Sequence, residues 1–256
     1  MSDFNTDIGP LLADIVEEAG RLVLPLWKSG LEVFSKADES PVTEADRRGE
    51  LLILERLETH FPGVHVISEE DASEFGTPDA IGDRFFLVDP VDGTKAFVRG
   101  DPNFTVNIAL IEGRRPVAGA VCAPATGETW YTEGGQTMKR MVGEAGKPVA
   151  ARAWPKGEAV ALVSHTMKED TLKALADKYG FDATRAMDSS IKFCRLAEGS
   201  ADVYPRHGPT MEWDIAAGHA VLEAAGGSVL TPEGEAFVYG KAEEKFRNGW
   251  FVARGR

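Results

Sequence analysis

Apolar positions at helical spacing open the chain. In residues 7–28 they recur every three or four positions, the pattern of an amphipathic helix that buries one face. Pro25 is expected to bend or end this helix, because proline lacks a main-chain N–H group. A second helix is predicted to begin after Thr43, with Thr43 as its N-cap and Asp46 at the third helical position. It should stop near Phe61–Gly63.

Short apolar runs bounded by turn residues predict strands. The expected strands cover residues 31–35, 64–67, 85–88, 104–111, 116–123, 128–131, 159–163, 201–204, 228–230 and 249–253. Further helices are predicted at 168–179, 191–198 and 213–225. Strands follow one another in the first half, whereas strands and helices alternate in the second, which favours an α/β layer there. We therefore predict an N-terminal α+β subdomain (1–150) and a C-terminal α/β subdomain (151–256).

The end of the strand predicted at 85–88 carries the most distinctive chemistry, because residues 89–94 read Asp-Pro-Val-Asp-Gly-Thr. On a continuing strand Asp89 and Asp92 would face opposite ways. Pro90 disfavours continuation, and a turn there would bring both carboxylates to one point. Such a pair calls for a hard cation such as Mg²⁺, and a glycine at a helix start suits a phosphate. Asp-Pro and Asp-Gly are also ordinary turn sequences, so both interpretations stay open at this point.

Other acids occur at the predicted ends of strands and helices. Glu69 follows the strand at 64–67, Asp214 begins the helix at 213–225, and Asp46 begins the second helix. Each has a plain structural alternative: a solvated acidic loop, a first-turn acid that interacts with the helix dipole, and a helix cap. A shared metal site requires these carboxylates to meet in space.

Composition narrows the classes of protein. A net charge of −13 over 256 residues argues against a protein that coats nucleic acid polymers. It allows a small phosphorylated substrate, because bound cations invert the local field. No apolar run of about 18 residues occurs, so we expect no integral membrane segment. Cys122 and Cys194 lie in apolar contexts and are predicted to be buried thiols. The expected location is the cytoplasm; a peripheral position at the inner membrane and a homodimer stay open.

Three separated motifs together resemble the inositol monophosphatase superfamily, the lithium-sensitive, Mg²⁺-dependent sugar and nucleotide phosphatases. They are the acidic pair Glu69-Glu70 after a strand, the sequence of residues 89–94, and the Trp-Asp-Ile-Ala-Ala-Gly helix start at 213–218. They occur in the family's order and cover nearly the whole chain. The resemblance implies an α+β / α/β protein with the layered αβαβα fold of the inositol monophosphatase and fructose-1,6-bisphosphatase type.

Within this superfamily the chain is most similar to the CysQ-type 3'(2'),5'-bisphosphate nucleotidases. The residues that carry this similarity are 40–46, 92–95, 104–110, 189–194 and 204–210. The resemblance implies hydrolysis of the 3'-phosphate of adenosine 3',5'-bisphosphate, and of 3'-phosphoadenylyl sulfate, in sulfur-assimilation metabolism. Ala96 stands where the subgroup usually has Glu, so inositol monophosphatase and histidinol-phosphatase stay as alternatives. A non-catalytic metal or nucleotide sensor is the alternative of a different class.

The resemblance also implies a role for each matched residue. The ligands of two or three Mg²⁺ ions would be Glu69, Asp89, the carbonyl of Val91, Asp92 and Asp214. The residues that act on the attacking water would be Asp46, Thr94 and Glu69. The nucleotide would be bound by Gly93, Thr94, Lys95, His165, Ser189, Lys192, Arg206 and Asp214. For His165, Lys192 and Arg206 the alternative is an ordinary surface position.

Overall fold

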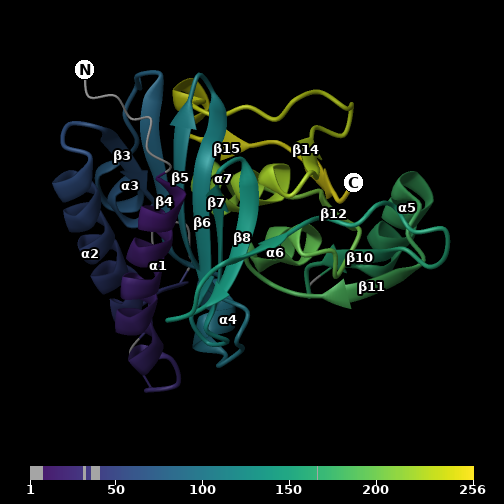
Figure 1. The fold of residues 1–256 in the computed structure, drawn as a ribbon, viewed down its shortest axis with the longest axis horizontal. Helices are drawn as coiled ribbons and strands as arrows, with labels where there is room; N and C mark the ends of the chain where they lie inside the picture. Colours follow the sequence, from purple (N-terminus) through teal and green to yellow (C-terminus); the bar gives the residue numbers. More distant parts are fainter. Residues whose placement is uncertain (1–7, 31–32, 36–40, 166) are drawn as a thin grey trace.

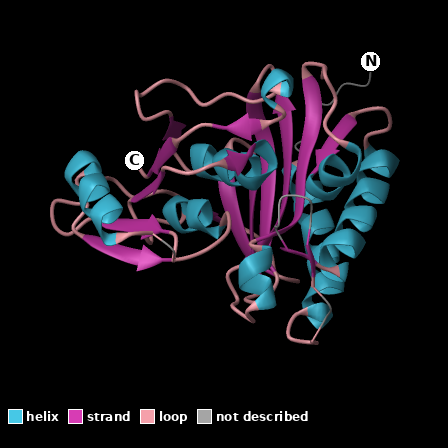
Figure 2. Ribbon diagram, turned by 180° about the vertical axis from the view of Figure 1, so that it is seen from behind, coloured by secondary structure: helices cyan, strands magenta, loops and turns pink. Residues whose placement is uncertain are grey.

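The structure is a computed structural model that describes residues 8–30, 33–35, 41–165 and 167–256. Parts of the loop expected at 36–41 and of the strand expected at 31–35 therefore lie outside the described residues. Five layers follow one another across the molecule (Figures 1 and 2). In order they are helices α1 (Gly9–Val23) and α2 (Glu44–His60), a seven-stranded sheet, helices α6 (Ile191–Ala197) and α7 (Glu212–Ala224), a five-stranded sheet, and helix α5 (Glu169–Tyr179). The predicted αβαβα fold is confirmed.

The large sheet is antiparallel except at one edge, where β3 and β4 run parallel. Its order is β3 (His65–Ser68), β4 (Arg84–Asp92), β5 (Thr105–Glu112), β6 (Arg115–Ala123), β7 (Glu128–Glu133), β8 (Gln136–Met141) and β9 (Lys147–Val149). The small sheet has the order β11 (Ala183–Ala186), β10 (Val160–Val163), β12 (Val203–Arg206), β16 (Phe251–Arg254) and β14 (Ser228–Leu230). Two short ladders complete the strands: β1 (Phe34–Ser35) with β2 (Pro41–Val42), and β13 (Thr210–Met211) with β15 (Arg247–Asn248).

Both N-terminal helices form as their sequences predict. α1 ends at Val23 and passes into a 3₁₀ turn that contains Pro25. The N-cap of α2 is Thr43, whose side chain accepts a hydrogen bond from the Ala45 N–H group, while Asp46 accepts one from the Thr43 N–H group at 2.8 Å. Reciprocal capping of this kind fixes the first turn of a helix. Both helices pack on the same face of the large sheet.

One sequence prediction near the site is wrong. Strand β4 does not stop before Pro90 but continues to Asp92. Its parallel neighbour β3 pairs only as far as Val88, so no ladder bond is lost at the proline. At Glu69 the structure differs from the plain structural alternative, a solvated loop, because Glu69 begins helix α3 (Glu69–Phe75). A short helix α4 (Thr94–Val98) follows β4.

A bulge in β4, and not the predicted turn, lets the carboxylates of Asp89 and Asp92 face the same way. Asp89 pairs with Asn107 on β5, and Asp92 pairs with Thr105, so three steps along β4 oppose two along its partner. The extra residue breaks the strict alternation of side chains. Asp89 and Asp92 can therefore face one side of the sheet although an odd number of steps separates them.

Helix α7 lies between the two sheets and is buried almost throughout. It lies so close to β6 that a Cβ atom on Gly119 would lie 2.9 Å from the Ala217 carbonyl oxygen. One apolar cluster joins residues of β4 and β7 to residues of α6 and β12, for example Phe85, Trp130 and Phe193. The division at residue 150 falls between β9 and β10 and stays a prediction.

Several smaller expectations can also be compared with the fold. Cys122 and Cys194 are buried free thiols, as predicted. His219 is buried inside α7 and contacts the Tyr239 hydroxyl at 2.8 Å, so it belongs to the core. In the described part of the chain, no helix is both long and apolar enough to span a membrane.

Candidate active site

A cavity of about 1340 Å³ opens where β4 ends and α3, α4, α6 and α7 begin. Most of the predicted site residues line it, although they come from distant parts of the chain. They are Glu69, Asp92, Gly93, Thr94, Lys95, His165, Ser189, Lys192, Arg206 and Asp214. Asp46, Asp89 and Val91 are buried behind its wall, at 1%, 1% and 0% exposure.

Four carboxyl groups act on one another at the floor of this cavity. Asp89 is hydrogen-bonded to Glu69, and burial, followed by the charges of Glu69 and Asp92, raises its pKa well above the ordinary range. Burial raises the pKa of Asp92 to about 6, although Lys192 opposes the shift. Burial and the charges of Asp92 and Glu69 likewise raise the pKa of Asp214. Like charges this close favour a cation between them.

The donor set fits Mg²⁺ by its chemistry. It consists of carboxylate oxygens with a main-chain carbonyl beside them, the ligands that a hard divalent cation prefers. Among the residues that the structure describes, no group of three or more Asp, Glu, His or Cys side chains is already arranged as a metal site. The fit therefore rests on donor type, burial and mutual repulsion, and the ligand assignment stays a prediction.

Glu69 is held in place by a buried acid that the sequence did not single out. Glu50 on α2 accepts hydrogen bonds from the main-chain N–H groups of Glu70 (3.0 Å) and Asp71 (3.3 Å). A carboxylate at these first N–H groups caps α3 from a neighbouring helix. Burial raises the pKa of Glu50. Glu50 thereby fixes the helix start from which Glu69 projects to the cavity.

Thr94 and Asp46 meet as the resemblance implies. The Thr94 hydroxyl lies 3.2 Å from Asp46 Oδ1 and 3.1 Å from the Val91 carbonyl oxygen, and both are acceptors. Asp46 Oδ2 accepts from the Thr43 N–H and hydroxyl groups, at 2.8 and 2.7 Å. Asp46 therefore caps α2 and contacts Thr94 at once. Since a hydroxyl carries one hydrogen, Thr94 can only accept further bonds from the cavity.

Asp92 is oriented from two elements. The Ser190 N–H group, at the start of α6, donates to Asp92 Oδ2, and the Asn107 amide lies 3.5 Å from the same oxygen. The Ser190 hydroxyl donates to Asn107 Oδ1 at 2.8 Å and lies 2.9 Å from the Thr105 hydroxyl. Ser190, Asn107 and Thr105 were part of the motifs that carried the resemblance, but they had no assigned role.

Glycine is required at residue 93, where the chain passes from β4 into α4. Its φ is +92°, and a Cβ atom there would lie 3.0 Å from the Asn103 carbonyl oxygen and 3.3 Å from Ser189 Cβ. Only glycine accepts this conformation without strain. Ser189 itself has φ +56°, and its hydroxyl accepts from the N–H group of Ile191, the first residue of α6. The starts of α4 and α6 therefore lie against each other.

The predicted cations differ in how far they are already engaged. Lys192 is 4% exposed and donates to the carbonyl oxygens of Ser189 (2.6 Å) and Met187 (3.3 Å). Burial lowers its pKa to about 8, against the effect of Asp92. Arg206 donates from Nη2 to the Pro209 carbonyl, and its buried Nε has no hydrogen-bond partner among the described residues. The remaining two, Lys95 and His165, are exposed at the cavity.

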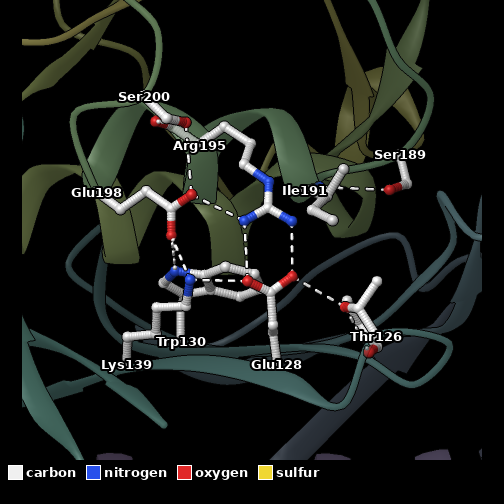
Figure 3. Close-up of polar contacts among 10 residues, drawn as sticks. Thr126, Glu128, Trp130, Lys139, Ser189, Ile191, Arg195, Glu198 and Ser200 are labelled. Atoms are coloured by element: carbon white, nitrogen blue, oxygen red, sulfur yellow. Dashed lines mark hydrogen bonds and ion pairs between the residues drawn. The ribbon is translucent and has the colours of Figure 1, made fainter. Parts of the chain in front are cut away.

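A polar cluster ties α6 to the large sheet (Figure 3). Arg195 on α6 donates to both carboxylate oxygens of Glu128, at 2.6 and 3.0 Å, and to Glu198 at 2.8 Å. Lys139 on β8 lies 2.7 Å from both acids, and Trp130 packs beneath the cations. The cluster fixes α6, the helix that presents Ser190 and Lys192 to the site. No sequence pattern predicted these contacts.

This cluster predicts a specific dependence of stability on pH. Burial alone would raise the pKa of Glu128, but Arg195 and Lys139 outweigh it and lower the pKa from 4.5 to about 2. At about 1.4 kcal/mol per pKa unit, this shift adds about 3 kcal/mol to the free energy of unfolding. The contribution is fully present above pH 4.5 and is lost as the pH falls toward 2. We expect Glu128→Gln to flatten the decline in unfolding free energy below pH 4.5, measured by urea denaturation. An unchanged slope would contradict the ion-pair assignment.

Comparison with known proteins agrees with this geometry. The family model for the inositol monophosphatase family matches residues 10–252. Proteins named 3'(2'),5'-bisphosphate nucleotidase CysQ are 37% identical in Salmonella typhimurium and 36% identical in Escherichia coli K12; each match covers 94% of this chain and 97% or 98% of the relative. The crystal structure of CysQ from Bacteroides thetaiotaomicron superposes with a TM-score of 0.77 at 32% identity, over 96% of both chains. The chain therefore belongs to the inositol monophosphatase family.

Proposed function

We propose that this protein is a Mg²⁺-dependent phosphomonoesterase that removes the 3'-phosphate of adenosine 3',5'-bisphosphate, and of 3'-phosphoadenylyl sulfate, as a cytoplasmic enzyme of sulfur metabolism. The observation that carries the proposal is one cavity lined by Glu69, Asp92 and Asp214 together with the cations Lys192 and Arg206. Its relatives named as bisphosphate nucleotidases, aligned over almost their whole length, support the choice of substrate.

The acidic floor is the proposed metal centre. Glu69, Asp89, the Val91 carbonyl, Asp92 and Asp214 would hold two or three Mg²⁺ ions. Bound Mg²⁺ would neutralise the phosphate and lower the pKa of water. The raised pKa values of Asp89, Asp92 and Asp214 support this role, because each carboxyl is buried beside others. Such a cluster is stabilised when cations are added.

The water and the phosphate would be positioned by the wall of the cavity. Thr94 donates its hydroxyl hydrogen to Asp46 or Val91, so its oxygen would accept a hydrogen bond from the attacking water. Withdrawing that proton makes the water a better nucleophile. The N–H groups of Gly93 and Thr94, at the start of α4, would hold the scissile phosphate.

A substrate panel tests the proposal. With Mg²⁺ present, we expect phosphate release from adenosine 3',5'-bisphosphate to exceed that from inositol monophosphate and histidinol phosphate by at least tenfold in kcat/KM, or about 1.4 kcal/mol. The physical reason is a second anionic group that only the bisphosphate offers to Lys192 and Arg206. Chelation of the metal should stop the reaction, and Li⁺ should inhibit it relative to K⁺.

The alternatives predict different results from the same panel. Faster release from inositol or histidinol phosphate would move the protein to another phosphatase of this family. Binding of the bisphosphate without release of phosphate would identify a nucleotide sensor. That outcome would contradict the role proposed for Asp46 and Thr94.

A further inference from the structure

Two cationic side chains that belong to none of the sequence motifs also line the cavity of the candidate active site. Lys245 and Arg247 line it from the loop between β14 and β16, and both are exposed. Within the described part of the chain, neither side chain forms a hydrogen bond or an ion pair. They are therefore available to a ligand, unlike Arg99, which also lines the cavity but is paired with Asp188 at 2.7 Å.

The loop that carries them is held by a buried acid. Glu212, the first residue of α7, is 0% exposed and accepts hydrogen bonds from the N–H groups of Gly240 (2.8 Å) and Lys241 (3.0 Å). The Lys241 ammonium lies 2.8 Å from the same carboxylate. In return, the Glu212 N–H group donates to the Phe246 carbonyl at 2.9 Å. The position of the loop is thus tied to the helix that bears Asp214.

The backbone presents the cations in a specific way. Lys245 and Phe246 are successive non-glycine residues with φ of +53° and +58°, a conformation that L-residues rarely adopt. Phe246 is fully buried, while Lys245 remains exposed at the cavity. Strain of this kind persists only where surrounding contacts impose it, and it gathers at ligand sites.

A short ladder places Arg247 beside the predicted metal site. Arg247 on β15 is the register partner of Met211 on β13, three residues before Asp214. Partners across an antiparallel ladder project from the same face, and both of these line the cavity. The Asn248 amide locks the register by donating to the Met211 carbonyl at 2.7 Å. Arg206, at the end of β12, lines the same cavity and contacts Pro209 just before β13.

The charge balance of the cavity points to a second anion. Among the described residues that line it, six are cationic and six acidic, and three of the acids are the proposed ligands Glu69, Asp92 and Asp214. Of the other acids, Asp188 is paired with Arg99, which leaves Asp79 and Glu243 against the remaining cations. With the floor neutralised by metal, the rest of the cavity is positive.

A bound phosphate can accept more hydrogen bonds than the inner cations donate. Each of its three strongly accepting oxygens can accept at least two hydrogen bonds. Lys192 keeps one free N–H bond beside those to Ser189 and Met187, and Arg206 keeps its Nε–H bond and the rest of its fork beside the bond to Pro209. Lys245 and Arg247 would add donors from a different element of the cavity wall.

We infer that Lys245 and Arg247, together with Arg206, grip the phosphate of the substrate that is not hydrolysed, and so select bisphosphorylated over monophosphorylated nucleotides. The inference rests on the proposed function. It assigns the loop at 240–248 to substrate selection. Asp214 and the selecting cations would then be positioned by one buried carboxylate, that of Glu212.

The test compares two substrates that differ only in this phosphate, adenosine 3',5'-bisphosphate and adenosine 3'-monophosphate. For the double variant Lys245→Met/Arg247→Met, the ratio of their kcat/KM values should fall at least about tenfold, mainly through KM for the bisphosphate. Inhibition by AMP, which retains the 5'-phosphate, should weaken by a similar factor. The double variant Lys156→Met/Lys173→Met removes two exposed cations outside the cavity. It is the matched control for net charge and should leave the ratio unchanged.

Each result decides one question. A ratio within twofold of wild type in the double variant would overturn the inference while leaving the proposed function intact. If the wild-type protein does not hydrolyse the bisphosphate, the proposed function fails and the inference falls with it. The charge-preserving pair Lys245→Arg/Arg247→Lys should retain most of the selectivity, which separates lost charge from a disturbed loop. Loss of selectivity in that pair as well would contradict a role for charge.

Discussion

Replacing Asp92 by Asn should reduce phosphate release from adenosine 3',5'-bisphosphate on the order of a thousandfold, because one anionic metal ligand supplies several kcal/mol of charge stabilisation. The fold should survive. An Asn oxygen can still accept from the Ser190 N–H group, which is the contact that ties Asp92 to α6. The change in Tm should stay below about 4 °C. Steady-state kinetics measures the loss of phosphate release, and thermal denaturation of the same preparation measures the change in Tm.

Asp79→Asn is the matched control, since Asp79 is an exposed acid that lines the same cavity and is no proposed ligand. It should keep nearly full turnover. Calorimetric titration with Mg²⁺ adds a second measurement: Asp92→Asn should bind the metal more weakly, and Asp79→Asn should not. Turnover close to wild type in Asp92→Asn would remove Asp92 from the ligand set.

Sequence patterns identified the parts of this fold that depend on local periodicity and capping. The spacing of apolar residues gave α1 and α2, and the pairing of Thr43 with Asp46 located the start of α2. Short apolar runs bounded by turn residues predicted the central strands of the large sheet. The strands that were missed, such as β8, β9 and β11, are short or carry many polar residues. Their stability comes from neighbouring strands and not from their own sequence.

The error at Pro90 and the undecided structure at Glu69 have one cause. Whether Pro90 ends a strand depends on whether a neighbour needs its N–H group, and that neighbour, β3, comes from residues 65–68. Whether Glu69 begins a helix depends on a cap from Glu50, on a different helix. Neither dependence is local, so patterns within a short window favoured a turn at Pro90 and left the structure at Glu69 open.

The residues of the candidate site also fall into two groups: those that sequence motifs indicate and those that only tertiary packing brings to the site. Motifs indicated the carboxylates, Thr94 and the inner cations, because residue type and order suffice for a resemblance. The supporting residues were not indicated. Arg195 and Glu128 meet across two layers of the fold, and Lys245 and Arg247 reach the cavity through a strained loop. Contacts of this kind arise from tertiary packing, and only coordinates place them.

Asp46 and Thr94 are the pair proposed to activate the water. Asp46→Asn tests this pair more sharply than removal of the side chain, because it reverses the hydrogen bond between the two residues without changing the shape of residue 46. The carboxylate accepts from Thr43 at one oxygen and from Thr94 at the other. An amide would keep its oxygen toward the two Thr43 donors and turn its NH₂ group toward Thr94. The Thr94 oxygen would then accept from this NH₂ group, which occupies one of its two acceptor positions and competes with the attacking water.

We expect kcat to fall by about 10²–10⁴-fold, the usual contribution of a positioned acid–base group. Mg²⁺ affinity and Tm should change little, since neither Asp46 nor Thr94 is a proposed ligand and the cap of α2 persists. Thr94→Val should lose a similar factor, whereas Thr94→Ser, which keeps the hydroxyl, should retain most of the activity.

The double variant Asp46→Asn/Thr94→Val decides whether the two residues act as a unit. Groups that act together show losses that do not multiply, so the double variant should be no slower than the slower single variant. Multiplied losses would mean that Asp46 and Thr94 contribute separately. Asp46 would then matter only as the cap of α2, and the hydroxyl of Thr94 would owe its effect to its contact with Val91.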